Sequence, residues 1–151
     1  MEDKSVSLRP MSIEDYDGVF SLWRITSSRA LSFSDEKEEL NKFLLRNEGL
    51  SVVAVCDGEI IGTVLAGHDG RRGFIYHMAV SPSHRRMGIG KRLAETAIRN
   101  LSSAGISKTH IFVFNDNFTG QGFWSSLGWV LRDDLLVFAS PQADSSGEVR
   151  V

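Results

Sequence analysis

Several residue types are scarce in this chain of 151 residues, and each scarcity narrows the classes of protein that fit it. A single cysteine, Cys56, excludes an internal disulfide and a zinc site made of several cysteines. Its place in the apolar run Ser51–Cys56 predicts a small, buried core residue. No apolar run approaches the length of a membrane span, and Met1–Lys4 are polar. We therefore expect a cytoplasmic protein that does not bind a membrane.

An excess of charge of one sign is also lacking. The net charge is −2 and the pI is near 6.1, so no global basic field favours nucleic acid as a partner. Hydrophobic residues make up 42% of the chain, which is typical of a globular protein with one core. No linker rich in proline, glycine or serine divides the sequence. We expect one domain over residues 1–139 and a polar, disordered tail over 140–151.

Strand and helix patterns alternate along the chain. Asp57 and Gly58 separate two runs rich in β-branched residues and are typical of a two-residue hairpin turn. Helices are expected to begin near Ser12 and Ser34 and to cover 88–104 and 120–126. The expected strands cover 6–9, 50–56, 59–67, 74–80, 109–114 and 130–138. This order, β-α-α-β-β-β-α-β-α-β, predicts an α/β fold with a mixed, mostly antiparallel sheet and helices on both faces.

The segment that follows the fourth expected strand has the features of an anion site. A helix begins there at Gly88 and Gly90, where backbone N–H groups lack helical partners and the helix dipole favours negative charge. The basic residues nearby are Arg85, Arg86, Lys91 and Arg92. The spacing excludes a P-loop, and Leu93 at the third glycine position argues against a dinucleotide-binding turn. A ligand with a diphosphate fits this segment, and so does a tight turn beside a solvated basic face.

Two motifs resemble those of the GNAT superfamily of N-acetyltransferases. Arg85-x-x-Gly88-x-Gly90, preceded by Ala79-Val80-x-Pro82, resembles the acetyl-coenzyme A signature. Asn117–Trp124 followed by Leu127–Trp129 resembles the downstream segment of the family, and the element order agrees from Val6 to Phe138. The stretch Gly67–Phe74 also resembles a YpeA-like bacterial branch. The resemblance implies a GNAT-like fold and direct transfer of an acetyl group from acetyl-coenzyme A to a primary amine in a ternary complex, without a metal.

The resemblance also implies which residues bind acetyl-coenzyme A. The strand end should hold the pantetheine arm like an added strand, and the N–H groups of the helix start should hold the pyrophosphate. Asn117 should form a hydrogen bond near the pantetheine. The implied set is Met78, Ala79, Val80, Arg85, Arg86, Met87, Gly88, Ile89, Gly90, Lys91, Asn117 and Trp124.

The catalytic groups are less well defined by the sequence. Trp124 stands where relatives often have a tyrosine that protonates the leaving thiolate, and an indole does not titrate usefully. Tyr76 is the remaining candidate acid, and His77 and His68 are candidate bases, since an unperturbed histidine has a pKa near 6.5. Tyr76 and His77 should face opposite sides of a regular strand unless a bulge intervenes. Packing roles fit all three residues, and a water-mediated base stays open.

The acceptor site should be formed by the first two helices and the loop between them. The expected substrate-binding residues are Trp23, Arg24, Ser27, Arg29 and Phe33, and Arg24 or Arg29 could hold a carboxylate of the substrate. A small-molecule amine is favoured over a protein N-terminus or lysine as the partner. Pairing of the last strand in a homodimer stays open. The alternative function is a regulatory module that binds coenzyme A with little or no catalysis. This alternative stays open because Trp124 stands where relatives often have a catalytic tyrosine.

Overall fold

The computed structural model describes residues 5–142 and residue 147. The chain divides into two compact units, residues 1–112 and residues 113–151, which are considered in turn. The expectation of one domain over 1–139 stays a prediction. The tail expected at 140–151 lies outside the described residues except for 140–142 and 147.

The first unit is organised around a five-stranded mixed sheet. Its strands are β1 (Ser7–Pro10), β2 (Val52–Cys56), β3 (Glu59–His68), β4 (Gly73–Val80) and β5 (Thr109–Ile111). They lie in the order β1-β2-β3-β4-β5, with antiparallel pairing up to β4 and parallel pairing between β4 and β5. The predicted fold class, α/β with a mostly antiparallel sheet, is therefore confirmed.

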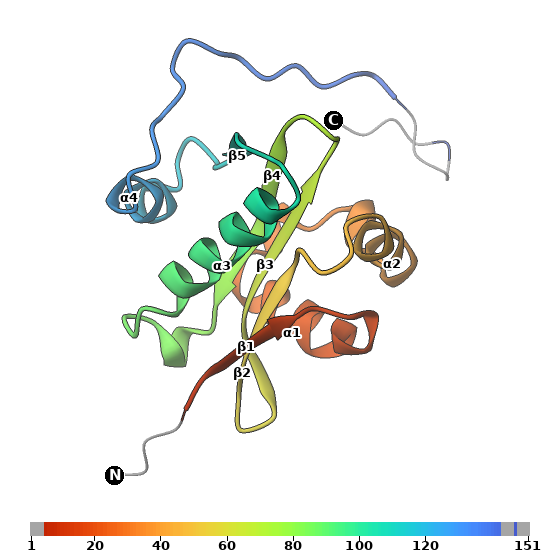
Figure 1. Ribbon diagram of the computed structural model, residues 1–151, viewed down its shortest axis with the longest axis vertical. Coiled ribbons are helices and arrows are strands. Elements are labelled where there is room, and N and C mark those ends of the chain that lie inside the picture. The colour runs from red at the N-terminus through yellow and green to blue at the C-terminus, as the bar shows by residue number, and fades with distance from the viewer. Residues whose placement is uncertain (1–4, 143–146, 148–151) are drawn as a thin grey trace. The chain divides into compact units, whose positions relative to one another are not determined.

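Helices cover both faces of this sheet (Figure 1). Helices α1 (Tyr16–Thr26) and α2 (Lys37–Arg46) lie on one face, and α3 (Ile89–Ser103) lies on the other. Short 3₁₀ turns precede or connect them at Ile13–Asp15, Ser28–Ala30, Phe33–Asp35 and Pro82–His84. In the described part of the chain, no helix combines the length and apolar character needed to span a bilayer.

The alternation of side chains along the strands forms two apolar layers. On the side of α1 and α2, Val19, Trp23 and Leu40 pack in one cluster with Val53 and Leu65. On the other side, a Cβ added to Gly62 would lie 3.0 Å from Leu93 Cδ1, so α3 packs very closely against β3. The buried face of α3 consists of Ile89, Leu93, Ala94, Ala97 and Leu101.

Local signals in the sequence explain several connections. Asp57 and Gly58 have φ values of 51° and 77°, as a type I′ hairpin turn requires, so the predicted turn is confirmed. Ser12 N–H donates to Asp15 Oδ2 at 2.9 Å, and this bond caps the helical segment that was expected to begin near Ser12. Cys56 is free and buried, as expected.

The second unit contains α4 (Phe118–Ser126) and a long segment without regular structure. The strand expected at 130–138 does not form, which corrects the sequence-based element order. Arg132 Nε and Asp134 Oδ1 lie 3.0 Å apart across a turn at Asp133 and Asp134, so the run of β-prone residues is interrupted at its centre. Leu131, Leu136 and other large apolar side chains of the segment are exposed.

Candidate functional site

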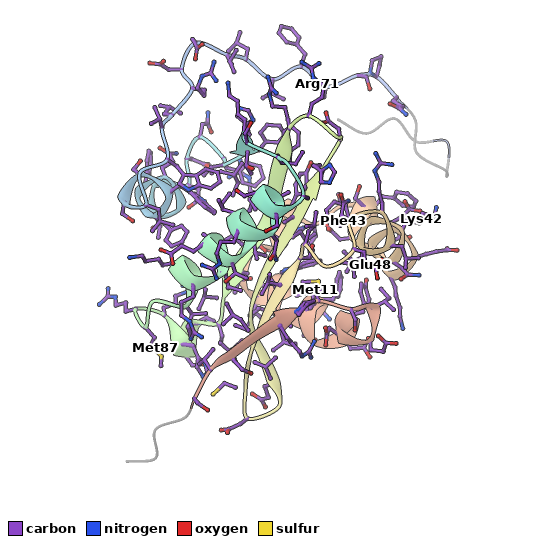
Figure 2. All side chains as sticks on the ribbon, viewed as in Figure 1. Met11, Lys42, Phe43, Glu48, Arg71 and Met87 are labelled. Atoms are coloured by element: carbon purple, nitrogen blue, oxygen red, sulfur yellow. The ribbon has the colours of Figure 1, made fainter. Side chains whose placement is uncertain are left out.

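The loop between β4 and α3 has the geometry of an anion-binding helix start. Gly88 is the N-cap of α3 with φ 76°, and Arg86 also has a positive φ of 63°. The first helical bond runs from Arg92 N–H to the Gly88 carbonyl at 3.1 Å, so the N–H groups before it have no helical acceptor. Arg85, Arg86, Met87 and Gly88 are exposed, and Figure 2 shows Met87 at this loop. Donors and basic side chains gathered at a helix start fit a phosphate-bearing ligand.

The edge of β4 next to β5 becomes unpaired before the strand ends. β5 pairs with β4 only over Gly73–Ile75, because β5 ends at Ile111. On its other edge β4 stays paired to β3 up to Val80. Residues 76–80 of β4 therefore have no β5 partner, and their backbone can bind an extended ligand as a strand would. Met78, Ala79 and Val80 lie in this part of β4, next to the loop that holds the glycines.

An irregularity in β4 decides where its side chains point. The register with β3 shifts between Thr63 and Leu65, which face Ala79 and Tyr76, so β4 has one residue more than β3 there. His77 occupies this bulge with φ 46°, an uncommon backbone conformation for a residue with a side chain. As a result Tyr76 and His77, neighbours in sequence, both line the cavity on the side of α2. A regular strand would separate them.

The imidazole of His77 is held by an aspartate from the loop before α2. His77 Nε2 lies 2.9 Å from Asp35 Oδ1, and both side chains are only 7% exposed. The second oxygen, Asp35 Oδ2, accepts from Ser32 N–H at 2.9 Å, and Tyr16 Oη donates to the Asp35 carbonyl at 2.9 Å. Asp35 is thus fixed by hydrogen bonds on three sides. Its carboxylate can orient the His77 ring and stabilise it when it is protonated.

Two buried residues fix the other sides of His77. The Trp23 indole of α1 stacks on the imidazole, with ring centroids 4.1 Å apart and planes at 19°. Trp23 Nε1 donates to Thr63 Oγ1 at 2.9 Å, and Thr63 Oγ1 donates to the His77 carbonyl at 2.9 Å. Trp23 and Thr63 are fully buried. This chain of contacts holds both the ring and the backbone of the bulge in place.

A cavity of about 510 Å³ lies in front of His77. Its walls come from the loop before α2, from α2, from Leu65 of β3 and from β4. The Tyr76 ring meets Phe43 edge-on at 6.1 Å, and Figure 2 shows Phe43 and Lys42 on α2. Burial raises the pKa of Tyr76 above its ordinary value, so its phenol stays protonated near neutral pH and can donate a hydrogen bond. The lining combines apolar side chains with a small number of charged ones, as small-molecule sites do.

Several residues expected at the site lie elsewhere. His68 ends β3, where its Nδ1 accepts from Gly70 N–H at 3.0 Å, and it does not line the cavity. Trp23 stacks on His77 and does not line the cavity wall. The other expected substrate-binding residues, Arg24, Ser27, Arg29 and Phe33, also do not line it, although the neighbouring Ala30, Ser32 and Ser34 do. The cavity therefore uses the expected loop with different residues.

Two expected cofactor-binding residues belong to the second unit. Asn117 is the N-cap of α4, and its Oδ1 accepts from Gly120 N–H at 2.9 Å. Trp124 is buried and packs against Phe123 and Trp129, with ring centroids 5.0 and 4.6 Å away. Both residues thus have a structural role within their unit. Their contacts with the pantetheine stay predictions.

Sequence reasoning missed Asp35, Phe43 and Arg46 as residues of the cavity. Asp35 follows Ser34, where the second helix was expected to begin, and an acidic residue at a helix start is commonly explained by the helix dipole. The available signal was its spacing of three from Ser32, which predicts a capping turn and hence a fixed carboxylate. In the described part of the chain, no group of three or more histidine, cysteine, aspartate or glutamate side chains is arranged to hold a metal ion.

Comparison with known proteins identifies the family and the fold of the chain. The model of the Acetyltransferase (GNAT) family matches residues 16–129. An acetyltransferase of Pectobacterium atrosepticum is 30% identical over 128 residues, which cover 85% of this chain and 90% of that protein. The PaiA N-acetyltransferase of Thermoplasma acidophilum, solved with coenzyme A, has a TM-score of 0.73 at 22% identity and covers 85% of this chain and 92% of its own. An aminoglycoside N-acetyltransferase, AAC(6')-Iy with CoA, has a TM-score of 0.74 at 19% identity over 92% and 97% of the two chains.

The two solved structures show a shared fold, and the family match and the Pectobacterium relative show the family. The chain belongs to the Acetyltransferase (GNAT) family and is an N-acetyltransferase that uses acetyl-coenzyme A.

Proposed function

We propose that the protein acetylates a small-molecule primary amine bound in the α2 cavity, with His77 taking the proton of the attacking amine. The observation that carries this proposal is the bulge in β4, which turns His77 into the cavity where Asp35 holds its Nε2. Acetyl-coenzyme A supplies the acetyl group as a thioester, which the amine attacks directly in a ternary complex. A cavity of about 510 Å³ favours a small molecule over a protein N-terminus or lysine.

The bond to Asp35 selects the useful tautomer of His77. A carboxylate accepts hydrogen bonds and does not donate them, so Nε2 carries the hydrogen and Nδ1 keeps its lone pair. Among the described residues, the Nδ1 atom of His77 has no hydrogen-bond partner. Part of its surface is accessible from outside the protein. An amine or a bridging water can therefore deliver its proton to Nδ1. The positive charge that results on the ring lies 2.9 Å from Asp35 Oδ1.

The remaining binding roles follow from the elements described above. The N–H groups at the start of α3, with Arg85 and Arg86, would hold the pyrophosphate of acetyl-coenzyme A. The unpaired part of β4 at Met78 and Val80 would hold the pantetheine arm. Tyr76, protonated and in the same cavity, would donate to the departing thiolate in place of the tyrosine that Trp124 replaces.

The test compares His77→Gln and Asp35→Asn with the unmodified protein in an assay of thiol release from acetyl-coenzyme A. We expect kcat/KM for the amine to fall by about 10²–10⁴ in His77→Gln. Asp35→Asn should also be impaired, because an amide that donates to Nε2 forces the hydrogen onto Nδ1. Calorimetric titration with coenzyme A should give unchanged affinity in both variants, which separates a loss of chemistry from a loss of folding.

His68→Gln is the matched control, because His68 is bonded within its hairpin and does not line the cavity. It should keep full activity. Full activity in His77→Gln, with the loss appearing in His68→Gln, would reject His77 as the base. Absence of binding by acetyl-coenzyme A to the unmodified protein would reject the proposed co-substrate site as a whole.

A further inference from the structure

We propose that the acceptor amine also carries a carboxylate, that Arg46 binds this carboxylate, and that an apolar body separates the two groups. This inference rests on the proposed function, because it assigns the acceptor class to the same cavity. It concerns the end of the cavity away from His77, where α2 finishes with Arg46.

The balance of charges in the cavity favours an anionic group on the ligand. Both carboxylates of the lining already have partners, since Asp35 binds His77 and Ser32, and Glu39 Oε1 lies 2.8 Å from Lys42 Nζ. Lys42 is thereby satisfied as well. Arg46 lines the same cavity and has no hydrogen-bond or ion-pair partner among the described residues. The guanidinium of Arg46 is therefore the charged group of the lining that is left to pair with a ligand, and it attracts an anion.

Arginine is suited to the role that this position offers. Its planar guanidinium presents paired donors that match the two oxygens of a carboxylate. Lys42, one turn earlier on α2, is the comparison within the same wall, and its ammonium is engaged by Glu39. A polycationic acceptor would meet an uncompensated positive charge at Arg46 with no free carboxylate to offset it. This separates the acceptor of this chain from an aminoglycoside, the substrate class in the name of one structural neighbour.

The length of α2 sets the spacing between the two groups of the acceptor. From Lys37 to Arg46 the helix advances about 14 Å at 1.5 Å per residue. An arginine side chain leans back toward the helix N-terminus, so the guanidinium reaches along this wall from its far end. Phe43, Tyr76, Leu40 and Leu65 line the intervening wall. An acceptor that meets both groups therefore carries an apolar body between its amine and its carboxylate, as a dipeptide with an aromatic residue does.

The experiment measures binding of a product-like probe, so that it needs no turnover. N-acetylphenylalanylglycine and its C-terminal amide would be titrated calorimetrically into the protein with coenzyme A present. We expect the acid to bind about tenfold more tightly than the amide, because only the acid offers a charge-assisted pair to Arg46. Arg46→Gln should remove this preference, and Arg46→Lys should keep part of it. Lys37→Gln, at the exposed start of α2 and outside the cavity lining, is the matched control and should behave like the unmodified protein.

Equal binding of acid and amide, or no binding of either, would overturn the proposal. So would an equal loss of preference in Arg46→Gln and Lys37→Gln. The result is separable from the proposed chemistry, because His77→Gln should bind the acid normally and still fail to acetylate. A functional His77 with no preference for the acid would leave the proposed function intact and reject the acceptor class.

Discussion

Asp35 joins the loop before α2 to the bulge of β4 through its two carboxylate oxygens. The sequence contains no direct sign of this link, because Asp35 and His77 are 42 positions apart in the chain. The capping turn around Asp35 is local and could be inferred from Ser32, but the identity of the second partner depends on how the sheet is built. At the level of single residues, the sequence therefore predicts the candidate base His77 and misses the group that orients it.

Removal of the phenol oxygen of Tyr76 tests the proposed proton donor. We expect Tyr76→Phe to lower kcat by about tenfold with little change in KM, because the edge contact with Phe43 is kept while the donor is lost. Steady-state kinetics with acetyl-coenzyme A and a panel of amines measures both constants. An unchanged kcat would assign Tyr76 to the cavity wall alone and leave water as the proton source.

The ion pair between Arg9 and Asp15 predicts a dependence of stability on pH. The two bonds from Arg9, 2.7 and 2.8 Å long, hold the pKa of Asp15 below its ordinary value. Stability from this pair is therefore present above the unfolded pKa of about 3.9 and is lost as the pH falls through the lower folded value. We expect Asp15→Asn to lower the free energy of unfolding by about 0.5–1 kcal/mol near neutral pH, since Arg9 is half exposed.

Urea unfolding at about pH 7 and about pH 3 checks this prediction. The difference in the free energy of unfolding between Asp15→Asn and the unmodified protein should become smaller at the acid pH. Glu48→Gln, on the exposed surface, serves as the control and should change stability at neither pH. If this difference in the free energy of unfolding grew on acidification, the predicted direction of the pH dependence would be wrong.

At the scale of elements, the packing of α2 on β3 leaves no room at Gly67. A Cβ there would lie 2.8 Å from Phe43 Cζ and 2.9 Å from Asn47 Nδ2. We expect Gly67→Ala to lower the free energy of unfolding by about 1–3 kcal/mol, because α2 or the Phe43 ring must shift. It should also weaken acceptor binding, since Phe43 is a wall of the cavity. Gly122→Ala in α4, where a Cβ meets nothing within 4 Å, is the matched control and should not destabilise the protein.

The start of α3 is expected to bind the phosphates of coenzyme A, so changes there should weaken its affinity. Arg85→Ala should weaken coenzyme A binding by about tenfold, because one charged partner of the phosphates is removed. Gly88→Glu should weaken it further, since it adds a negative charge and strains a position with φ 76°. Calorimetry measures both affinities, and Arg99→Ala, late in the same helix, should bind normally. Unchanged affinity in the first two variants would remove the helix start from the site.

Patterns of local origin explain why most elements could be predicted. The hairpin at Asp57 and Gly58 and the periodic faces of the helices are determined by neighbours in sequence. From the sequence, a bulge at His77 could be stated only as an exception to the expected alternation of side chains. It arises from the pairing of β4 with β3, which the sequence does not specify. The strand predicted at 130–138 was wrong, since β-prone residues specify a strand only when a partner edge is available. The ion pair of Arg132 with Asp134 instead closes a turn there.

For the whole molecule, the exposed apolar side chains of 130–138 predict self-association. Leu136 and Phe138 are 85% and 90% exposed, which is unusual for such large apolar groups. We expect sedimentation velocity to show association that grows with concentration. Replacing both residues by serine should reduce it while leaving the free energy of unfolding within about 0.5 kcal/mol. A monomer at every concentration would reject the homodimer that the sequence left open.

The extra residue in β4 also acts as a phase shift along the strand. Before it, even-numbered positions such as Tyr76 face α2, and after it odd-numbered positions such as Ala79 do. Deleting the bulged residue would restore plain alternation without turning the later side chains, because Tyr76 and Ala79 would then be two positions apart and would still pair with Leu65 and Thr63. Ala79 would stay in the core and the backbone edge proposed for pantetheine would keep its direction, while the imidazole of His77 would be lost. The extra residue thus adds one side chain to the cavity without changing the core contacts of the strand that follows it.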